Sequence, residues 1–114
     1  MPPDETPVNR VRTAIGRSRR VEEKKMFGGL AFMVEGKMCV SVGRRRIMCR
    51  IDPATHDAAL VQEGCTAVVM KGREYRGYVH VAADAVKTKR QLDYWVNLAL
   101  DFNGRAKAST RKRQ

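Results

Sequence analysis

The chain has 114 residues and a net charge of +11, with 23 lysines and arginines against 12 acidic residues. This length fits one domain that buries about two-thirds of the surface of its unfolded chain without needing a disulfide or a metal. The sequence lacks both an apolar run of membrane-spanning length and the basic-then-apolar start of a signal peptide, so we expect a cytoplasmic protein without membrane contact.

The first predicted element is a helix that begins after Thr6, because Thr6 suits the N-cap and Pro7 suits the first helical position. Its apolar residues recur at helical spacing, at Val8, Val11 and Ile15. Gly16 is expected to end this helix, because glycine is common just after the last helical residue.

The next stretch, VEEKKMFGGLAFMVEGKMCVSV, holds two apolar runs around Glu35 and Gly36 and predicts a β-hairpin. A two-residue loop would hold Glu35 at a positive φ, which a residue with its side chain resists. We therefore predict a three-residue loop that ends at Gly36, with positive φ at Gly36 and with Phe32 opposite Met38. This register gathers Leu30, Phe32, Val34, Met38, Val40 and Val42 on one face of the hairpin. The face away from the main core carries Ala31, Met33 and Cys39.

Gly28 and Gly29 form a pair at the start of a predicted strand. A phosphate-binding loop would need a helix directly after the pair and a Lys-Ser or Lys-Thr partner, and the sequence has neither. The pair is therefore predicted to mark a bulge or the close approach of another backbone.

The remaining elements complete an antiparallel sheet. Residues 47–51 alternate in polarity as a half-buried strand does, and a short helix is predicted to start at Asp52. Two further strands are predicted at 65–70 and 75–81, followed by a last helix at 86–102. The order α-β-β-β-α-β-β-α predicts the α+β class, with a five-stranded antiparallel sheet and helices packed against it.

The last helix has the widest apolar stripe of the chain, formed by Leu92, Trp95, Val96, Ala99 and Phe102. Trp95 lies at the centre of this stripe, so we predict that its side chain is buried against the sheet. The domain is expected to cover residues 6–103. Residues 104–114, GRAKASTRKRQ, carry five basic residues and no acidic residue, which predicts a basic, disordered tail.

Three segments carry a resemblance to a known family. The string EKKMFGGLAFMVEGKMC at 23–39 is similar to the signature of the N-terminal domain of the TfoX/Sxy family. The residues GR at 72–73 and RGYV at 76–79 resemble the family's GR..KGYV segment, and YWVNLAL at 94–100 fits its closing helix. The resemblance implies a fold similar to that of secretion-chaperone-like proteins. It also implies a regulatory association with natural competence, without a catalytic mechanism.

Few residues are candidates for chemistry. The three cysteines, Cys39, Cys49 and Cys65, lack CxxC spacing, which favours reduced thiols over a zinc site. His56 is expected on the exposed side of a short helix and His80 on the polar face of a strand. Neither histidine lies in a motif with a nucleophile. We therefore expect no enzyme, no catalytic residue, no metal and no cofactor.

Basic residues outside the tail gather at turns and strand starts in three groups. These are Arg17, Arg19, Arg20, Lys24 and Lys25; Arg44, Arg45 and Arg46; and Lys71, Arg73 and Arg76. They are either solvated turns or a phosphate-contacting surface that converges on one end of the sheet. The candidate nucleic-acid contacts are Arg44, Arg45, Arg46, Lys71, Arg73 and Arg76. Because no aromatic platform or recognition helix accompanies them, such contact would tolerate any sequence and weaken with salt.

Two functions remain open from the sequence. The first is a non-enzymatic regulatory or protein-interaction domain of the TfoX/Sxy type, with a candidate partner face at Ala31, Met33 and Cys39. This face either takes a protein partner or a second copy of the chain, or is covered by the first helix or a loop. The alternative is a sequence-tolerant nucleic-acid-binding protein that acts through its basic turns and tail.

Overall fold

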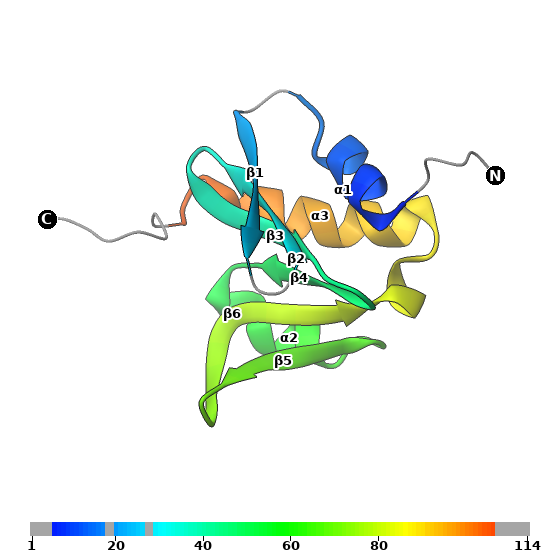
Figure 1. Ribbon diagram of the computed structural model, residues 1–114. Coiled ribbons are helices and arrows are strands. Elements are labelled where there is room, and N and C mark those ends of the chain that lie inside the picture. Colours follow the sequence, from blue (N-terminus) through cyan, green and yellow to red (C-terminus); the bar gives the residue numbers. More distant parts are fainter. Residues whose placement is uncertain (1–5, 18–19, 27–28, 107–114) are drawn as a thin grey trace, which may run out of the picture.

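A computed structural model describes residues 6–17, 20–26 and 29–106 (Figure 1). Within these residues the elements are α1 (Pro7–Ile15), β1 (Val21–Met26), β2 (Gly29–Val34), β3 (Lys37–Val42), β4 (Arg46–Arg50), η1 (Pro53–Thr55), α2 (His56–Leu60), β5 (Cys65–Met70), β6 (Arg73–Ala82), η2 (Ala83–Val86) and α3 (Lys89–Asn103). The two η elements are short 3-10 helices. The predicted α+β class is confirmed.

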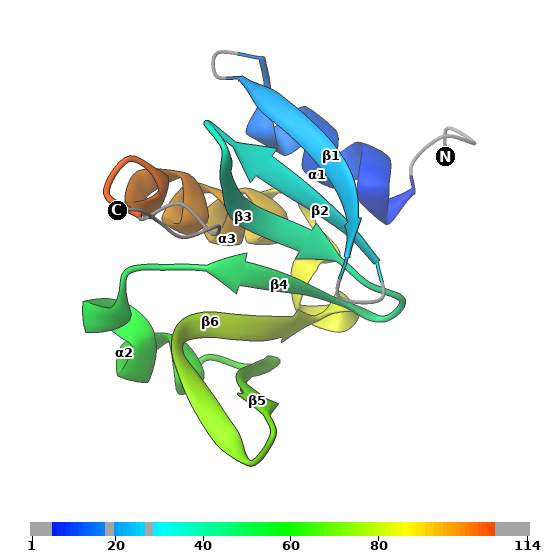
Figure 2. The same ribbon diagram turned by 60° about the vertical axis from the view of Figure 1, so that its left-hand side comes forward.

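The strands of the described residues form one antiparallel sheet of six, in the order β1-β2-β3-β4-β6-β5. Figures 1 and 2 show α1 and α3 on one face of this strongly twisted sheet. The predicted five strands are one too few, and the additional strand is β1. Its sequence, VEEKKM, has four exposed charged residues and no apolar alternation. A strand at the edge of a sheet accommodates such charges, which also discourage pairing with other chains.

The main core lies between the helices and one face of the sheet. Val11 and Ile15 of α1 and Trp95 and Val96 of α3 are all buried there. Trp95 is 3% exposed, which confirms its predicted burial. The helical periodicity of the two terminal helices therefore identified the residues that hold them against the sheet.

Local capping explains where these helices begin. The Thr6 hydroxyl accepts a hydrogen bond from the Asn9 N–H at 3.2 Å, so α1 begins as predicted. α3 begins at Lys89 rather than at residue 86, because Thr88 and Gln91 form a capping box.

The β2–β3 hairpin differs from the predicted register. Its loop has two residues, Glu35 and Gly36, with φ values of 53° and 79°, and Met33 lies opposite Met38. Arg20 supports Glu35 in this conformation. The Glu35 N–H donates to the Arg20 carbonyl at 2.9 Å, and the Glu35 carboxylate accepts from the Arg20 N–H at 3.1 Å. The positive φ of Gly36 is confirmed, and the predicted three-residue loop is wrong.

A β-bulge in β3 accounts for the rest of the difference. Phe32 faces Val40 whereas Met33 faces Met38, so Cys39 is an extra residue in β3. Cys39 and Val40 both join the core under the helices, and Met38 points to the other face. The predicted pairing of Phe32 with Met38 is therefore wrong, because it assumed two strands without an insertion.

A second apolar cluster lies on the sheet face away from the helices. It consists of Ala31, Met33, Met38, Met48 and Val68, all buried. Met26 from β1 and Tyr78 from β6 pack against these residues. These two side chains therefore help to shield the cluster from water.

Gly29 lies where two backbones approach closely, as predicted for the glycine pair. A Cβ atom at Gly29 would overlap the carbonyl oxygen of Val42 and lie 2.9 Å from its carbonyl carbon. We expect Gly29→Ala to lower the free energy of unfolding by about 1–3 kcal/mol, because β2 and β3 must shift apart. Urea unfolding followed by circular dichroism measures this change. Gly28 lies outside the described residues.

Gly104→Ala is the matched control for Gly29→Ala. Gly104 has a φ of −65°, and a Cβ atom there would meet nothing within 4 Å. We expect a change within about 0.5 kcal/mol. Equal losses of stability in the two variants would contradict the close approach at Gly29.

The start of the predicted tail is attached to the domain. Residues 104–106 continue from α3, and the Arg105 guanidinium donates to the Asp52 carboxylate at 2.8 Å. It also lies 5.4 Å from the centroid of the Phe102 ring. The rest of the predicted tail, residues 107–114, lies outside the described residues.

Candidate functional site

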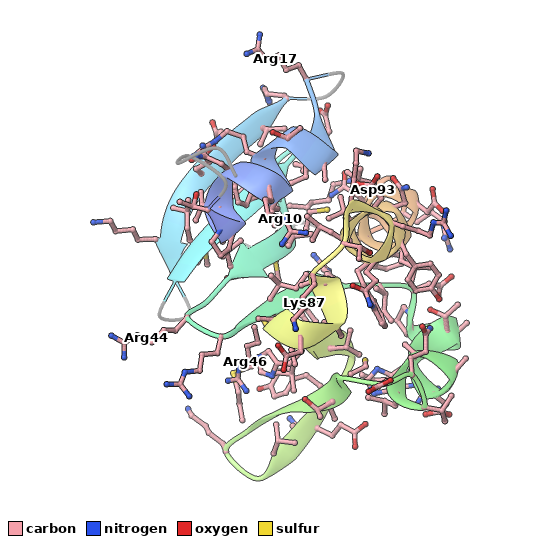
Figure 3. The ribbon with its side chains drawn as sticks, turned by 90° about the vertical axis from the view of Figure 1, so that its right-hand side faces the viewer. Arg10, Arg17, Arg44, Arg46, Lys87 and Asp93 are labelled. Carbon is pink, nitrogen blue, oxygen red and sulfur yellow. The ribbon has the colours of Figure 1, made fainter. Side chains whose placement is uncertain are left out.

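Arg44, Arg45 and Arg46, together called the arginine turn, join β3 to β4. Backbone hydrogen bonds fix this turn at both ends: the Gly43 N–H donates to the Arg46 carbonyl at 2.9 Å, and the Ala83 N–H donates to the Arg45 carbonyl at 2.9 Å. All three arginine side chains are exposed, and Figure 3 shows Arg44 extending from the side of the molecule. A fixed backbone therefore presents three guanidinium groups to solvent.

The acidic residues that form ion pairs bind cations other than those of the arginine turn. The ion pairs with arginine or lysine are Arg12–Glu23, Arg76–Asp57, Lys87–Asp84, Lys89–Asp93 and Arg105–Asp52. Within the described residues, no carboxylate pairs with any member of the arginine turn. The three guanidinium groups of the turn are therefore without an ion-pair partner among the described residues.

Arg46 also acts on the neighbouring strand. Burial lowers the pKa of His80, and the charge of Arg46 lowers it further. Arg46 and His80 line a hollow of about 40 Å³ together with Ser41, Gly43 and Met48. The hollow is too small for a ligand of drug size, so the chemistry of this end is that of its surface charges.

The expectation that the basic groups converge on one end of the sheet is wrong. Arg46 pairs with Ala82 near the end of β6, whereas Lys71 and Arg73 lie at the β5–β6 turn, where β6 begins. The two groups therefore lie at opposite ends of the sheet. Arg76 donates to both carboxylate oxygens of Asp57, at 3.1 and 3.2 Å, and lowers the pKa of that carboxyl group.

The first basic group divides between the two ends. Arg20 precedes β1, and the first residue of β1, Val21, lies opposite Val34 at the far end from the arginine turn. Lys25 lies opposite Leu30, whose other neighbour is Val42, so Lys24 and Lys25 lie toward the arginine turn. Arg19 lies outside the described residues.

The candidate partner face at Ala31, Met33 and Cys39 is not exposed. These side chains are 0%, 6% and 1% exposed. Ala31 and Met33 belong to the second apolar cluster, and the bulge turns Cys39 into the main core. Contrary to the expectation of an open face, these residues are buried, and α1 does not cover the first two, because it packs on the other face of the sheet.

A groove of about 390 Å³ lies between α1 and the start of α3, lined in part by Arg10, Lys87, Lys89 and Asp93 (Figure 3). Arg10 donates to the carbonyl oxygens of Val86 and Lys87 at 2.7 and 3.0 Å. Lys89 pairs with Asp93 at 2.6 Å. Arg10 therefore ties α1 to the segment before α3, whereas the Lys89–Asp93 pair lies within α3.

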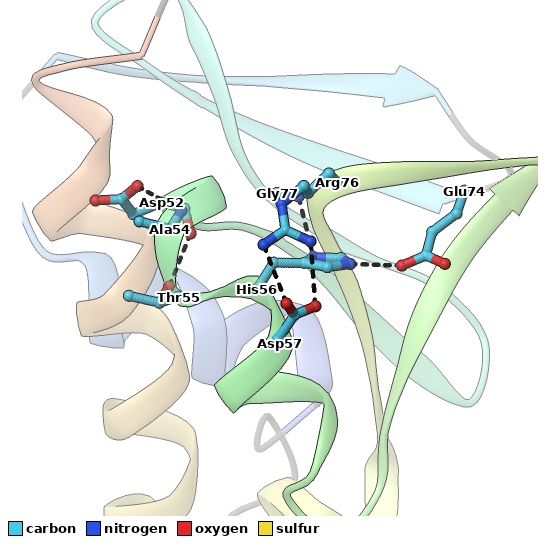
Figure 4. Close-up of polar contacts among 8 residues, drawn as sticks. All are labelled: Asp52, Ala54, Thr55, His56, Asp57, Glu74, Arg76 and Gly77. Carbon is cyan, nitrogen blue, oxygen red and sulfur yellow. Dashed lines mark hydrogen bonds and ion pairs between the residues drawn. The ribbon is translucent and has the colours of Figure 1, made fainter.

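His56 is the site residue that the sequence reasoning misplaced. Its side chain is fully buried, so the expected exposure is wrong. Nδ1 accepts a hydrogen bond from the Gly77 N–H at 3.0 Å, and Nε2 lies 2.8 Å from the Glu74 carboxylate (Figure 4). Because Nδ1 is an acceptor, the proton lies on Nε2, which donates to Glu74. His56 lies three positions before Ala59, so both residues share one face of the helix, and both are buried. This spacing from an apolar residue was the sequence signal that His56 faces inward.

Removing the imidazole tests how far His56 stabilises the bend of β6 at Gly77. We expect His56→Ala to lower the free energy of unfolding by about 2–4 kcal/mol, because it leaves a cavity and an unsatisfied buried N–H at Gly77. Chemical denaturation measures this loss. Glu74→Gln is the control: the Glu74 side chain is 51% exposed, so a loss below about 1 kcal/mol is expected. A similar loss in both variants would contradict the role of the Gly77 hydrogen bond.

The thiols are poor nucleophiles. Cys39, Cys49 and Cys65 are reduced and buried. Burial raises the pKa of Cys49 strongly, and the two other thiols raise it further. In the part of the chain that the structure describes, no three His, Cys, Asp or Glu residues are grouped to hold a metal ion. None of the helices described is long and apolar enough to cross a membrane.

Comparison with known families agrees with this fold. A family model for the TfoX N-terminal domain matches residues 14–103. The chain belongs to the TfoX N-terminal domain family. The match runs from α1 to the last residue of α3, so the arginine turn and His56 are both part of this TfoX N-terminal domain. No curated protein and no solved structure matches the chain.

Proposed function

We propose that this TfoX N-terminal domain is a non-enzymatic regulatory domain that acts by binding a protein partner. The side chains that could do chemistry are occupied or buried. Both ring nitrogens of His56 are hydrogen-bonded, and burial disfavours the thiolate of Cys49. Because the resemblance associates the TfoX/Sxy family with natural competence, we propose that the binding event serves transcriptional regulation.

The arginine turn is the observation that carries this proposal. Three exposed guanidinium groups on a fixed backbone, without a carboxylate partner in the described residues, repel one another. An external anion relieves this repulsion, and arginine binds carboxylates through paired hydrogen bonds. Lys71 and Arg73 lie at the opposite end of the sheet, so the basic surface around the arginine turn does not extend to them and is compact. A compact basic surface suits an acidic patch on a partner protein.

Affinity capture from a nuclease-treated lysate of the native cytoplasm tests the binding of a protein. The baits are the full chain, an Arg44→Ala, Arg45→Ala, Arg46→Ala variant, and a control. The control, Arg17→Ala, Arg20→Ala, Arg73→Ala, removes the same charge from the opposite end of the sheet. A protein retained by the full chain and the control but absent from the arginine-turn variant supports the proposal. Equal retention by all three baits contradicts it.

The second candidate function is sequence-tolerant binding to nucleic acid. The arginine turn also favours this function, because arginine is well suited to phosphate groups and Lys24 and Lys25 lie toward the same end. In this function the partner is the phosphate backbone, and affinity falls steeply with salt. Salt-dependent binding of a labelled DNA duplex that the arginine-turn variant weakens therefore distinguishes this candidate from protein binding.

A further inference from the structure

The two edges of the sheet differ in how they are protected. β1 carries four exposed charged residues, an arrangement that keeps an edge strand from pairing with another chain. β5, CTAVVM, has no charged residue and no proline. Val69 and Met70 on β5 are 59% and 40% exposed. Of the two edges in the described residues, only β5 lacks charged residues along its length.

β5 also keeps the extended form that pairing requires. Ala67 lies opposite Val79, and Val69 lies opposite Glu74. Between these two pairs, β5 has one residue and β6 has four. The irregularity therefore belongs to β6, which bends at Gly77, where φ is 93°. Alternate residues of an edge strand direct their N–H and C=O groups away from the neighbouring strand. β5 thus presents a regular row of such groups.

The residues that flank β5 are complementary in charge. Glu63 precedes the strand and Lys71 follows it, and both are exposed. Neither takes part in an ion pair within the described residues. Both residues lie in the turns that directly flank the strand, so if a second β5 pairs antiparallel with Ala67 opposite Ala67, Glu63 of each copy comes near Lys71 of the other. The edge is therefore complementary to itself.

We propose that two copies of this chain associate along β5, in antiparallel register around Ala67, and extend their sheets into one. Pairing about a two-fold axis satisfies the outward backbone groups of both strands and brings Glu63 near Lys71 twice. The partner strand also covers part of Val69 and Met70. Because two strand edges bury a small area, the dissociation constant is expected to lie at about 1–100 μM.

Sedimentation equilibrium of the full chain across a concentration series tests this dimer. Val69→Lys adds a charge to the edge, so we expect the dissociation constant to rise at least about tenfold. Asn97→Lys, on the exposed side of α3, adds the same charge elsewhere and is expected to leave the dimer unchanged. Circular dichroism checks that both variants are folded.

Charge reversal tests the register. Glu63→Lys and Lys71→Glu alone each bring like charges close together twice, and each is expected to weaken the dimer about tenfold. The double variant restores opposite charges, so its dissociation constant should return to within about threefold of the original. A monomer at every concentration up to about 1 mM overturns the proposal. A dimer that Val69→Lys leaves unchanged, or reversals that fail to compensate in the double variant, also overturns it.

Discussion

Replacing Trp95 with alanine is expected to lower the free energy of unfolding by about 3–5 kcal/mol. Trp95 is 3% exposed and lies in the core cluster between α3 and the sheet. Its ring also meets Tyr94 edge to face, with 5.2 Å between the ring centroids. Removing the indole leaves a cavity that the surrounding strands fill only in part. Since a domain of this kind is stable by about 5–15 kcal/mol, this loss would unfold a large part of the protein at elevated temperature.

Urea unfolding followed by circular dichroism measures the loss in Trp95→Ala. Asn97→Ala is the matched control, because Asn97 is exposed on the same helix. Its free energy of unfolding is expected to stay within about 0.5 kcal/mol of the original value. A loss below about 1 kcal/mol for Trp95→Ala would show that α3 does not depend on this side chain for docking.

The arginine-turn variant is expected to bind duplex DNA more weakly than the unmodified chain if nucleic acid is the partner. For duplex DNA, the slope of log affinity against log salt falls by about 0.9 for each phosphate group that the protein no longer neutralises. Arg44→Ala, Arg45→Ala, Arg46→Ala should therefore reduce the slope by roughly two to three. Fluorescence anisotropy of a labelled duplex, titrated with the full chain and with the variant at several salt concentrations, measures the slope.

The charge-matched control makes this result interpretable. Arg17→Ala, Arg20→Ala, Arg73→Ala removes three exposed arginines at the far end of the sheet, and Figure 3 shows Arg17 well away from Arg44 and Arg46. This control is expected to change the slope by less than about one. The residues beyond 106 are the same in both variants, so their charges cancel in the comparison. An unchanged slope in the arginine-turn variant would show that the turn does not contact DNA and would leave protein binding as the proposed function.

Short-range patterns in the sequence determined most of the elements of this protein. Thr6 and Pro7 predicted the start of α1, and the stripe around Trp95 predicted the buried face of α3. The EKKMFGG string pointed to the TfoX N-terminal domain family, which the family match confirmed. Such features succeed because helix caps and periodic burial depend on residues within a few positions of one another.

Only the tertiary structure decided the remaining features. The positive φ of Glu35 depends on hydrogen bonds to Arg20, fifteen positions away, so the loop length did not follow from local preference. The bulge at Cys39 added a residue that no local pattern marks, and it exchanged the faces of Met38 and Cys39. β1 forms because β2 offers it a partner, although its own residues are mostly charged.

The candidate site also depended partly on the sequence and partly on the tertiary structure. The sequence identified the arginine turn, because three consecutive arginines between two strands are visible without a fold. It did not show that Lys71 and Arg73 lie at the opposite end, since that depends on the pairing of β6 with β4 and β5. His56 became buried because its two hydrogen-bond partners, Glu74 and Gly77, come from a strand some twenty residues later. Strand pairing joins residues that are distant along the chain, and a single sequence carries little information about which of them meet.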